Sequence, residues 1–547
     1  MPSPYRQRLA TILVLGLAMR LLFALVLPPG YDESYYLFYG QHLALSYFDH
    51  PLAIGLWSWL GNLLGGGILA LRLPVLLSYT LATALLAEAT RRSFGPTAAL
   101  LSAALATLSP LLLVGGGLLL LPDSPLLLVL SLLIAWLAHH PLSQTSTLRQ
   151  NLVLGGILGL LTLCKYQAFL LIASLLLLRL HQSWRQRAWR PAQTLAVFSS
   201  WLLVSSPLWI WNLTNGWASL AFQTGRTSTA HGFQPFGPLL FGLSQFGLLF
   251  PTVAVALIAA LAADPRRHPV LARQQEWART LRWMVFPQLL MFALLAGRMQ
   301  VLQTWLLPAW WLTLPLAGAV LQPAWERRQP GLRRAARLTL VLVPLLCLLA
   351  AGHVRWGLAS ALLPSSVDTS TELMEPAELR RSLQQDPAIW QALTEAEVIA
   401  SNRYELPGFL ALALRDRSQA HYTVISRDPR GFHFWRHRIP TSVARGVFYL
   451  LHSAAGRSAT LQANGQLEMV RPLGSVNLMR GGQPALRLDF FSFDPARSAV
   501  HGPTQPASAQ LSPAGPGAEP LRSEARSRLT DLNRWPSLYK SAALPLS

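Results

Sequence analysis

Hydrophobic residues gather in long runs between residues 8 and 352, and short polar segments separate the runs. Most runs are long enough for a helix that crosses the ~30 Å hydrocarbon core of a bilayer. Polar and charged residues return after Arg355. The pattern predicts a mainly α-helical, polytopic membrane bundle followed by a smaller soluble domain. It indicates about eleven spans, at approximately 9–28, 68–89, 95–114, 122–138, 151–164, 167–180, 193–211, 236–262, 282–297, 302–320 and 336–352.

The fifth and sixth of these runs are short for complete crossings. One interpretation is a pair of half-depth helices that meet near Lys165, which a membrane tolerates where protein or water covers the break. The first run, Leu9 to Leu27, follows two arginines and shows no small-residue cleavage site near its end. We therefore expect it to be an uncleaved span.

Charge strengthens the membrane interpretation and orients the chain. Only 13% of the residues are charged, whereas soluble domains carry about 25%. The net charge of +21 comes from basic clusters between apolar runs, which is typical of cytoplasmic loops and argues against nucleic-acid binding. An odd number of spans then places the N-terminus in the cytoplasm and the C-terminal domain outside the plasma (inner) membrane. Cys164 and Cys347 both lie in apolar runs and imply no disulfide framework.

Three regions follow from this organisation. Residues 1–352 form the transmembrane domain, with helices lying along the membrane surface within the first outer loop, 33–66. Residues 353–497 form a small extracytoplasmic α/β or α+β domain. Residues 498–547 are rich in Pro, Ser, Ala and Gly and are expected to be disordered.

The first outer loop contains adjacent carboxylates, Asp32 and Glu33, and then the pair Asp49 and His50. A carboxylate just outside a span is a candidate general base. The structural alternative is that Asp32 and Glu33 stabilise a helix N-terminus. Asp49 could equally cap a turn before Pro51.

Lys165 is one of two lysines in the chain and lies within an apolar region. A cation at membrane depth marks a functional site with a partner, although a lysine can also extend to the interface. Asp123 lies at the outer edge of another span, where it either takes part in the site or caps the helix.

Further polar and aromatic residues occur at the same predicted depth, where aromatics commonly serve as anchors. Together the outer residues suit transfer of a sugar from a lipid phosphate. A carboxylate deprotonates the acceptor, cations hold the departing phosphate, and aromatic surfaces hold the sugar. We expect Asp32 and Glu33 to be catalytic. The expected phosphate-binding residues are His50, Lys165, Arg226 and Arg298, and the expected substrate-binding residues are Tyr35, Tyr36, Asp49, Asp123, Asn212 and Trp217.

Several short motifs share one family resemblance. They are Asp32-Glu33 with Tyr35-Tyr36, Tyr47 to Pro51, Arg72 to Pro74, Pro122 to Pro125, Lys165-Tyr166, Trp211-Asn212 with Gly216-Trp217, Asn402 to Tyr404 and Gly431 to Trp435. In combination they resemble the membrane glycosyltransferases of the C fold. The match is closest to bacterial members of glycosyltransferase family 39, which are related to protein O-mannosyltransferases and the lipid A aminoarabinose transferase.

The resemblance implies a polyprenyl-phosphate sugar as donor, inversion at the anomeric carbon, and Asp32 as the base. Glu33 would support it or orient the acceptor, and His50 and Lys165 would lie near the donor phosphate. The acceptor would be lipid A, a glycan, another lipid or a protein hydroxyl. Two departures from the family pattern are Leu52 after Pro51, where a second proline is common, and Gln303-Thr304-Trp305 in place of an Asn-Trp pair. The second departure bears on acceptor or donor specificity more than on the reaction type.

No cofactor is certain. A divalent cation is compatible with the carboxylates and His50, but their spacing matches no metal motif and we assign no metal ligands. Two other classes of function compete with the transferase. One is a secondary transporter or lipid-carrier flippase with Lys165 and Asp123 as a coupling pair, and the other is a catalytically silent scaffold for envelope assembly.

Overall fold

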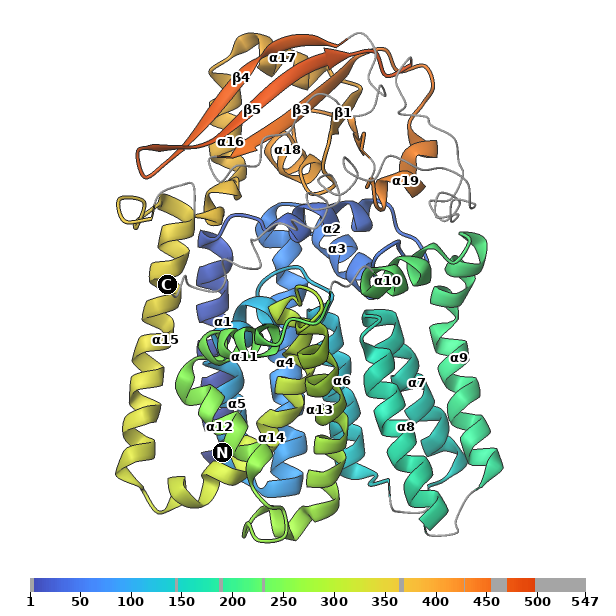
Figure 1. Cartoon of the computed structure of the whole chain (residues 1–547), viewed down its shortest axis with the longest axis vertical. Coiled ribbons are helices and arrows are strands. Elements are labelled where there is room, and N and C mark those ends of the chain that lie inside the picture. Colours follow the sequence, from blue (N-terminus) through green and yellow to red (C-terminus); the bar gives the residue numbers. More distant parts are fainter. Residues whose placement is uncertain are drawn as a thin grey trace.

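A helical bundle carries a sheet-containing domain at one end in the computed structural model (Figure 1). The structure describes residues 4–142, 146–185, 190–228, 232–363, 368–426, 428–453 and 470–496. The expected disordered tail, 498–547, lies outside the described residues. The N-terminus is at the end of the bundle opposite the sheet domain, as an odd number of crossings requires.

The long helices of the bundle follow the predicted apolar runs. They are α1 (Pro4–Val26), α4 (Ile68–Phe94), α5 (Pro96–Thr107), α6 (Asp123–His139), α7 (Leu148–Cys164), α8 (Ala168–Arg185), α9 (Pro191–Thr214), α11 (Phe236–Leu249), α12 (Pro251–Ala262), α13 (Gln275–Ala296), α14 (Leu307–Glu326) and α15 (Pro330–Trp356). Short turns are η1 (Leu112–Gly116), η2 (Leu271–Gln274) and η3 (Gln303–Leu306).

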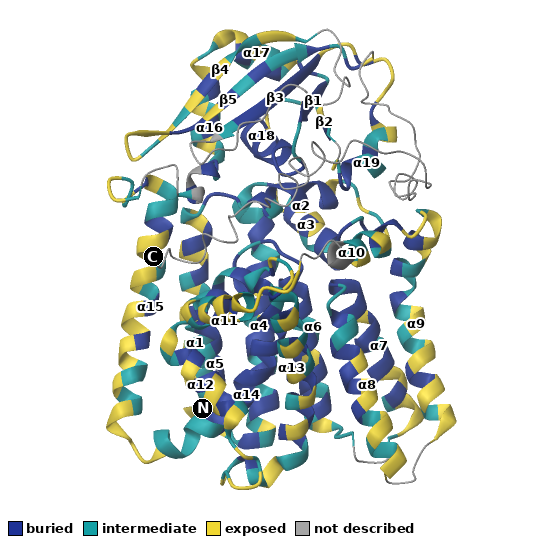
Figure 2. Ribbon diagram, viewed as in Figure 1, coloured by how far each residue is buried: buried dark blue, intermediate teal, exposed yellow. Residues whose placement is uncertain are grey.

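Five of these helices are long and apolar enough to cross a membrane in the described part of the chain, or six if α11 and α12 count as one bent span. Helix α14 is central, whereas α1 and α15 expose apolar side chains along their length (Figure 2). An apolar exterior of this kind is what lipid contact requires. The protein is therefore a multi-pass membrane protein, and the exact number of spans stays a prediction.

Two local expectations need correction. The predicted span 236–262 is broken, because α11 and α12 meet at an angle of 116°. Phe250 has a φ of 73°, and Pro251 begins α12. Proline has no N–H group with which to continue the preceding helix, and its ring disfavours a helical conformation of the residue before it. The supposed half-depth helices α7 and α8 contain 17 and 18 residues, which corresponds to about 26 Å each. They run nearly the thickness of the hydrocarbon core.

Small residues allow the bundle helices to approach closely, as is common in membrane proteins. A Cβ atom on Gly155 of α7 would lie 2.2 Å from the carbonyl oxygen of Val197 on α9. Several polar side chains inside the bundle are paired. The Trp311 indole donates to Ser131 Oγ at 2.8 Å, and the Ser102 hydroxyl donates to the Leu314 carbonyl at 2.9 Å.

Three shorter helices lie at the end of the bundle that faces the sheet domain: α2 (Tyr31–Gln41), α3 (Ala53–Leu63) and α10 (Ala218–Ser228). Helix α2 lies between the bundle and the domain. From Tyr31 to Gly40 every residue of α2 except Asp32 is buried. The first outer loop therefore forms the base on which the C-terminal domain rests.

The C-terminal domain has a five-stranded mixed sheet in the order β2-β1-β3-β5-β4. Strand β1 is parallel to β2 and β3, with Val398 opposite both His421 and Gly446, whereas β5 is antiparallel to β3 and β4. The sheet and its helices confirm the expected mixed domain. Its elements are η4 (Thr369–Glu372), α16 (Pro376–Gln384), α17 (Pro387–Glu395), β1 (Val398–Ser401), α18 (Pro407–Ala413), β2 (His421–Val424), α19 (Phe432–Trp435), η5 (Arg436–Arg438), β3 (Gly446–Ser453), β4 (Arg471–Arg480) and β5 (Gln483–Phe493).

The domain is docked closely onto α2. The Ser34 hydroxyl donates to the Glu405 carbonyl at 2.6 Å, and a Cβ atom on Gly408 would lie 2.0 Å from the Ser34 carbonyl oxygen. Tyr31 packs edge-on against Phe409 at a centroid distance of 5.6 Å. Only glycine fits between α18 and α2 at position 408.

We expect Gly408→Ala to loosen this docking, because the added methyl group collides with backbone atoms that cannot rotate away. The variant should be cleaved faster than wild type by limited proteolysis between the bundle and the domain, and its Tm should fall. Gly331→Ala is the control, because a Cβ atom there has no neighbour within 4 Å. Equal protection of both variants would contradict the docking described here.

Candidate active site

Glu33 and Arg72 form a fully buried ion pair at the start of α2. Arg72 Nη2 and Nε donate to the two Glu33 carboxylate oxygens at 2.6 and 2.9 Å, and neither side chain is exposed. The backbone N–H groups of Gly30 and Leu120 also donate to this carboxylate, each at 2.9 Å. Glu33 thus holds together α2, α4 and the segment before α6.

Arg72 also caps the C-terminal end of α1. Its guanidinium donates to the carbonyls of Ala24, Leu27 and Pro28 at 3.0, 2.8 and 3.0 Å. The last carbonyls of a helix lack partners within the helix, so a buried helix end needs such donors. The motif from Arg72 to Pro74 gave no indication of a partner for this arginine. An arginine inside an otherwise apolar span was the available signal.

Asp32 differs from its neighbour in being partly exposed in the first turn of α2. Burial raises the pKa of the Tyr404 phenol well above its usual value; Arg430 opposes this shift, and the charges of Glu405 and Asp32 add to it. The simple expectation that both carboxylates lie in a helical first turn is correct. The two carboxylates differ in exposure. Glu33 is buried and paired with Arg72, whereas Asp32 is partly exposed to solvent.

Asp49 joins the first outer loop to the C-terminal domain. Arg430 Nη1 lies 3.2 Å from Asp49 Oδ2, and both side chains are buried. The Tyr39 hydroxyl donates to Asp49 Oδ1, and the Tyr35 hydroxyl approaches the same oxygen at 3.3 Å. Burial, followed by the negative charge of Asp49, raises the pKa of both phenols well above its usual value. These tyrosines therefore remain neutral donors.

No sequence motif pointed to Arg430, although this residue directly precedes the motif from Gly431 to Trp435. Its guanidinium lies 4.1 Å from the Tyr404 ring centroid and 5.0 Å from that of Phe222. Burial opposes its charge, but Tyr404, Asp428 and Asp49 together raise the pKa of Arg430 above its usual value. The domain thus supplies a permanent cation to the loop beneath it.

Lys165 is paired with Asp123, as the sequence analysis expected of a cation at membrane depth. Lys165 Nζ lies 2.8 Å from both Asp123 carboxylate oxygens, and both residues are buried. Asp123 begins α6 and Lys165 follows α7, so the pair joins two helix ends on the side of the bundle that faces the domain.

The remaining predicted residues are distributed around this level. The rings of His50 and Tyr36 are 5.5 Å apart, and Tyr36 is buried. Asn212 is buried at the end of α9, and Trp217 is half exposed with a φ of 59°. Arg298 is exposed after α13. Arg226 belongs to α10, but its side chain lies outside the described residues.

The described geometry unites some predicted residues and leaves others apart. Tyr35 and Asp49 share one hydrogen-bonded group, and Lys165 and Asp123 share another. A cavity shared by Asp32 and Lys165 stays a prediction. In the described part of the chain no three His, Cys, Asp or Glu side chains gather in a group that could hold a metal ion.

The fold resembles that of the C-type membrane glycosyltransferases. A family model described as dolichyl-phosphate-mannose-protein mannosyltransferase matches residues 49–211. Together these findings confirm the resemblance to glycosyltransferase family 39. No curated protein sequence matches the chain significantly.

One solved structure supports the fold, and two others are reported with it. The chain is similar to apo ArnT from Cupriavidus metallidurans, with a TM-score of 0.54, 16% identity, and coverage of 88% of this chain and 97% of that one. The same protein bound to undecaprenyl phosphate gives a TM-score of 0.49, 14% identity and the same coverage. The oligosaccharyltransferase AglB from Archaeoglobus fulgidus, in complex with an inhibitory peptide and a dolichol-phosphate, gives 0.42, 14%, and coverage of 80% and 69%.

The enclosure of Glu33 predicts a stability defect on substitution. We expect Glu33→Gln to lower the free energy of unfolding by about 3–5 kcal/mol, because Arg72 loses its buried counter-charge. Thermal unfolding in detergent measures this change. Glu88→Gln is the control, because Glu88 pairs with Arg91 and Arg92 while more than a third of its side chain is exposed. A Tm of Glu33→Gln equal to that of Glu88→Gln would refute the structural role of Glu33.

A double substitution distinguishes structure from function at the second buried pair. Asp123→Asn and Lys165→Met should each destabilise the protein, because each leaves an uncompensated charge or lost hydrogen bonds. Asp123→Leu combined with Lys165→Met should recover much of the Tm. We expect sugar transfer to remain lost in the double variant. Recovery of both stability and transfer would show that the pair is structural only.

Proposed function

We propose that this protein is an inverting glycosyltransferase that moves a hexosyl or pentosyl group from a polyprenyl-phosphate donor to an extracytoplasmic acceptor. The observation that carries the proposal is the contrast between Asp32 and the rest of α2. One carboxylate remains accessible in a helix that is otherwise buried as far as Gly40. The family match and the C-type fold favour the same reaction class.

Asp32 is the general base in this proposal. It removes the proton from the acceptor hydroxyl as the oxygen attacks the anomeric carbon, and the bond from that carbon to the phosphate oxygen breaks. The lipid phosphate leaves with the bonding electrons. Glu33 is a positioning residue, because its carboxylate is fully occupied by Arg72 and two backbone N–H groups.

Lys165 stabilises the negative charge that grows on the departing phosphate. Its ammonium has three N–H donors, and the two bonds to Asp123 leave one for a phosphate oxygen. Asp123 holds that ammonium in place. His50, Arg226 and Arg298 are the further residues that we assign to the donor phosphate, and Tyr36, Asn212 and Trp217 to the substrate.

Tyr35 and Asp49 act on the site by fixing the C-terminal domain above it. Both contact groups of that domain, namely the Gly431 N–H at 2.9 Å and the Arg430 guanidinium. They therefore set the shape of the acceptor side. Acceptor identity, whether lipid A, a glycan, another lipid or a protein hydroxyl, depends on that shape and is open.

The orientation that we propose places this site outside the cytoplasm. The α12–α13 and α14–α15 connections, which carry basic clusters, lie at the same end of the bundle as the N-terminus (Figure 1). Positive loops resist translocation, so that end is assigned to the cytoplasm. The C-terminal domain then faces the periplasm or the cell exterior, where an activated lipid donor supplies the energy for transfer.

Asp32→Asn should reduce sugar transfer about 10²–10⁴-fold, because it removes the base that takes the acceptor proton. Thermal unfolding checks that the variant is folded. The assay uses protein reconstituted with a labelled polyprenyl-phosphate sugar and envelope material from a deletion strain. Mass spectrometry of the products identifies the acceptor. Asp264→Asn, at an exposed carboxylate between α12 and α13, is the control.

Wild-type turnover of Asp32→Asn would contradict the assignment of the base. A flux measurement in the same proteoliposomes tests the alternative of a secondary transporter or lipid-carrier flippase. Movement of the lipid-linked sugar across the bilayer without transfer would favour that alternative.

A further inference from the structure

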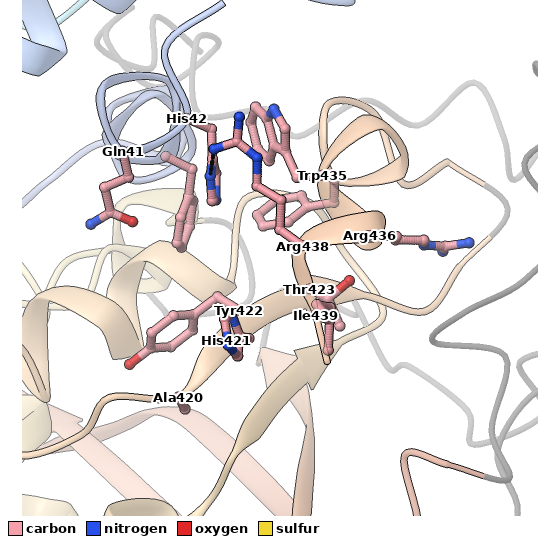
Figure 3. A pocket seen from close by; sticks show the side chains of 12 residues that line it. Gln41, His42, Ala420, His421, Tyr422, Thr423, Trp435, Arg436, Arg438 and Ile439 are labelled. Atoms are coloured by element: carbon pink, nitrogen blue, oxygen red, sulfur yellow. Dashed lines mark hydrogen bonds between the residues drawn. The ribbon is translucent and has the colours of Figure 1, made fainter. Parts of the chain in front are cut away.

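A small cavity lies at the opposite end of α2 from Asp32, between that helix end and the C-terminal domain (Figure 3). Its volume is about 120 Å³. Asp32 and His42 are ten residues apart along the chain, which corresponds to about 15 Å in a helix. None of the residues that we assign to base or donor phosphate lines this cavity.

The polar lining of the cavity is cationic or neutral. His42, His421, Arg436 and Arg438 all contribute to it, and no aspartate or glutamate does so in the described part of the chain. Arg438 Nη1 donates to His42 Nδ1 at 3.0 Å, which fixes that histidine as neutral. Burial, followed by the charges of Arg438, His421 and His437, lowers the pKa of His42 to about 4.

The same domain also contains Arg430, which is buried and has carboxylate partners. Arg430 lies 3.2 Å from Asp49 and 3.3 Å from Asp428. Arg436 is partly buried and Arg438 is exposed, and no carboxylate in the described lining of the cavity neutralises either of them. A group of cationic side chains without a carboxylate is therefore an environment that an anion stabilises.

Two polar atoms around the cavity have no hydrogen-bond partner among the described residues. The Thr423 hydroxyl is one, in a residue that is 1% exposed, and Arg436 Nε is the other. Arg436 is held in place through Nη2, which donates to the Val424 carbonyl at 2.9 Å. Buried polar groups nearly always have partners, so the Thr423 hydroxyl provides a donor for a bound acceptor group. The Arg436 side chain extends away from His42 and Arg438 (Figure 3).

We propose that this cavity is a binding site for a phosphate group, carried either by a soluble molecule or by a lipid headgroup. A phosphate presents several acceptor oxygens to a convergent set of donors and pairs well with planar guanidinium groups. The cavity volume corresponds to about four water molecules, which accommodates a phosphate group. The Trp435 indole packs on the His42 ring at 4.8 Å and gives the cavity an apolar wall.

Isothermal titration of the full-length protein in detergent with inorganic phosphate tests this site, with chloride at equal ionic strength as the reference. Wild type should bind phosphate in preference to chloride. Arg438→Gln and His42→Gln should each weaken phosphate binding about tenfold or more. Arg445→Gln, which removes an exposed arginine of the same domain outside the cavity, should not. Thermal unfolding without phosphate checks that each variant is folded.

The Asp32→Asn protein should bind phosphate as wild type does, so this test is independent of the proposed reaction. A second titration in nanodiscs distinguishes the sources of the phosphate. If phosphatidylglycerol displaces inorganic phosphate and phosphatidylcholine does not, the ligand is an anionic lipid headgroup; if neither displaces it, the ligand is soluble. Equal binding of phosphate and chloride, or an equal loss in Arg445→Gln, would overturn the proposal.

Discussion

The buried pair of Glu33 and Arg72 is the contact on which the rest of the site depends. It joins the end of α1, the start of α2 and the segment before α6 through bonds of 2.6–3.0 Å. Two charges out of water are stable only when their hydrogen bonds are satisfied, and here the described contacts meet that condition. With α2 fixed in this way, the neighbouring Asp32 has a defined position and partial access to solvent.

The C-terminal domain also fixes the position of the first outer loop. Buried aromatic rings, the Gly408 contact and the Arg430–Asp49 pair attach the domain to the first outer loop, of which α2 is part. The bundle supplies the Lys165–Asp123 pair from below, while the domain supplies a cation from above. The site that we propose between them would have fewer water molecules around it than the open surface, which strengthens electrostatic interactions. This is the environment that transfer from a lipid phosphate requires.

Much of the architecture could be predicted from the sequence, because apolar runs and basic loops report directly on the membrane. Pro251 is a sequence signal for the break at Phe250, although the apolar run continues through it. A partner for Lys165 was expected, because a cation at membrane depth is rarely unpaired. The difference between a buried, paired Glu33 and a partly exposed Asp32 could not be predicted. It depends on Arg72, which is 39 residues away from Glu33 in the sequence. Arg430 was similarly hidden, since its partner Asp49 lies 381 residues away.

Carbodiimide labelling of carboxylates in the folded protein, read by mass spectrometry, tests the central claim most directly. Asp32 should react and should become protected when polyprenyl phosphate is added, whereas Glu33 should stay unreactive throughout. Labelling of Glu33 in the native protein, or an Asp32 that the lipid phosphate fails to protect, would contradict the account of this site.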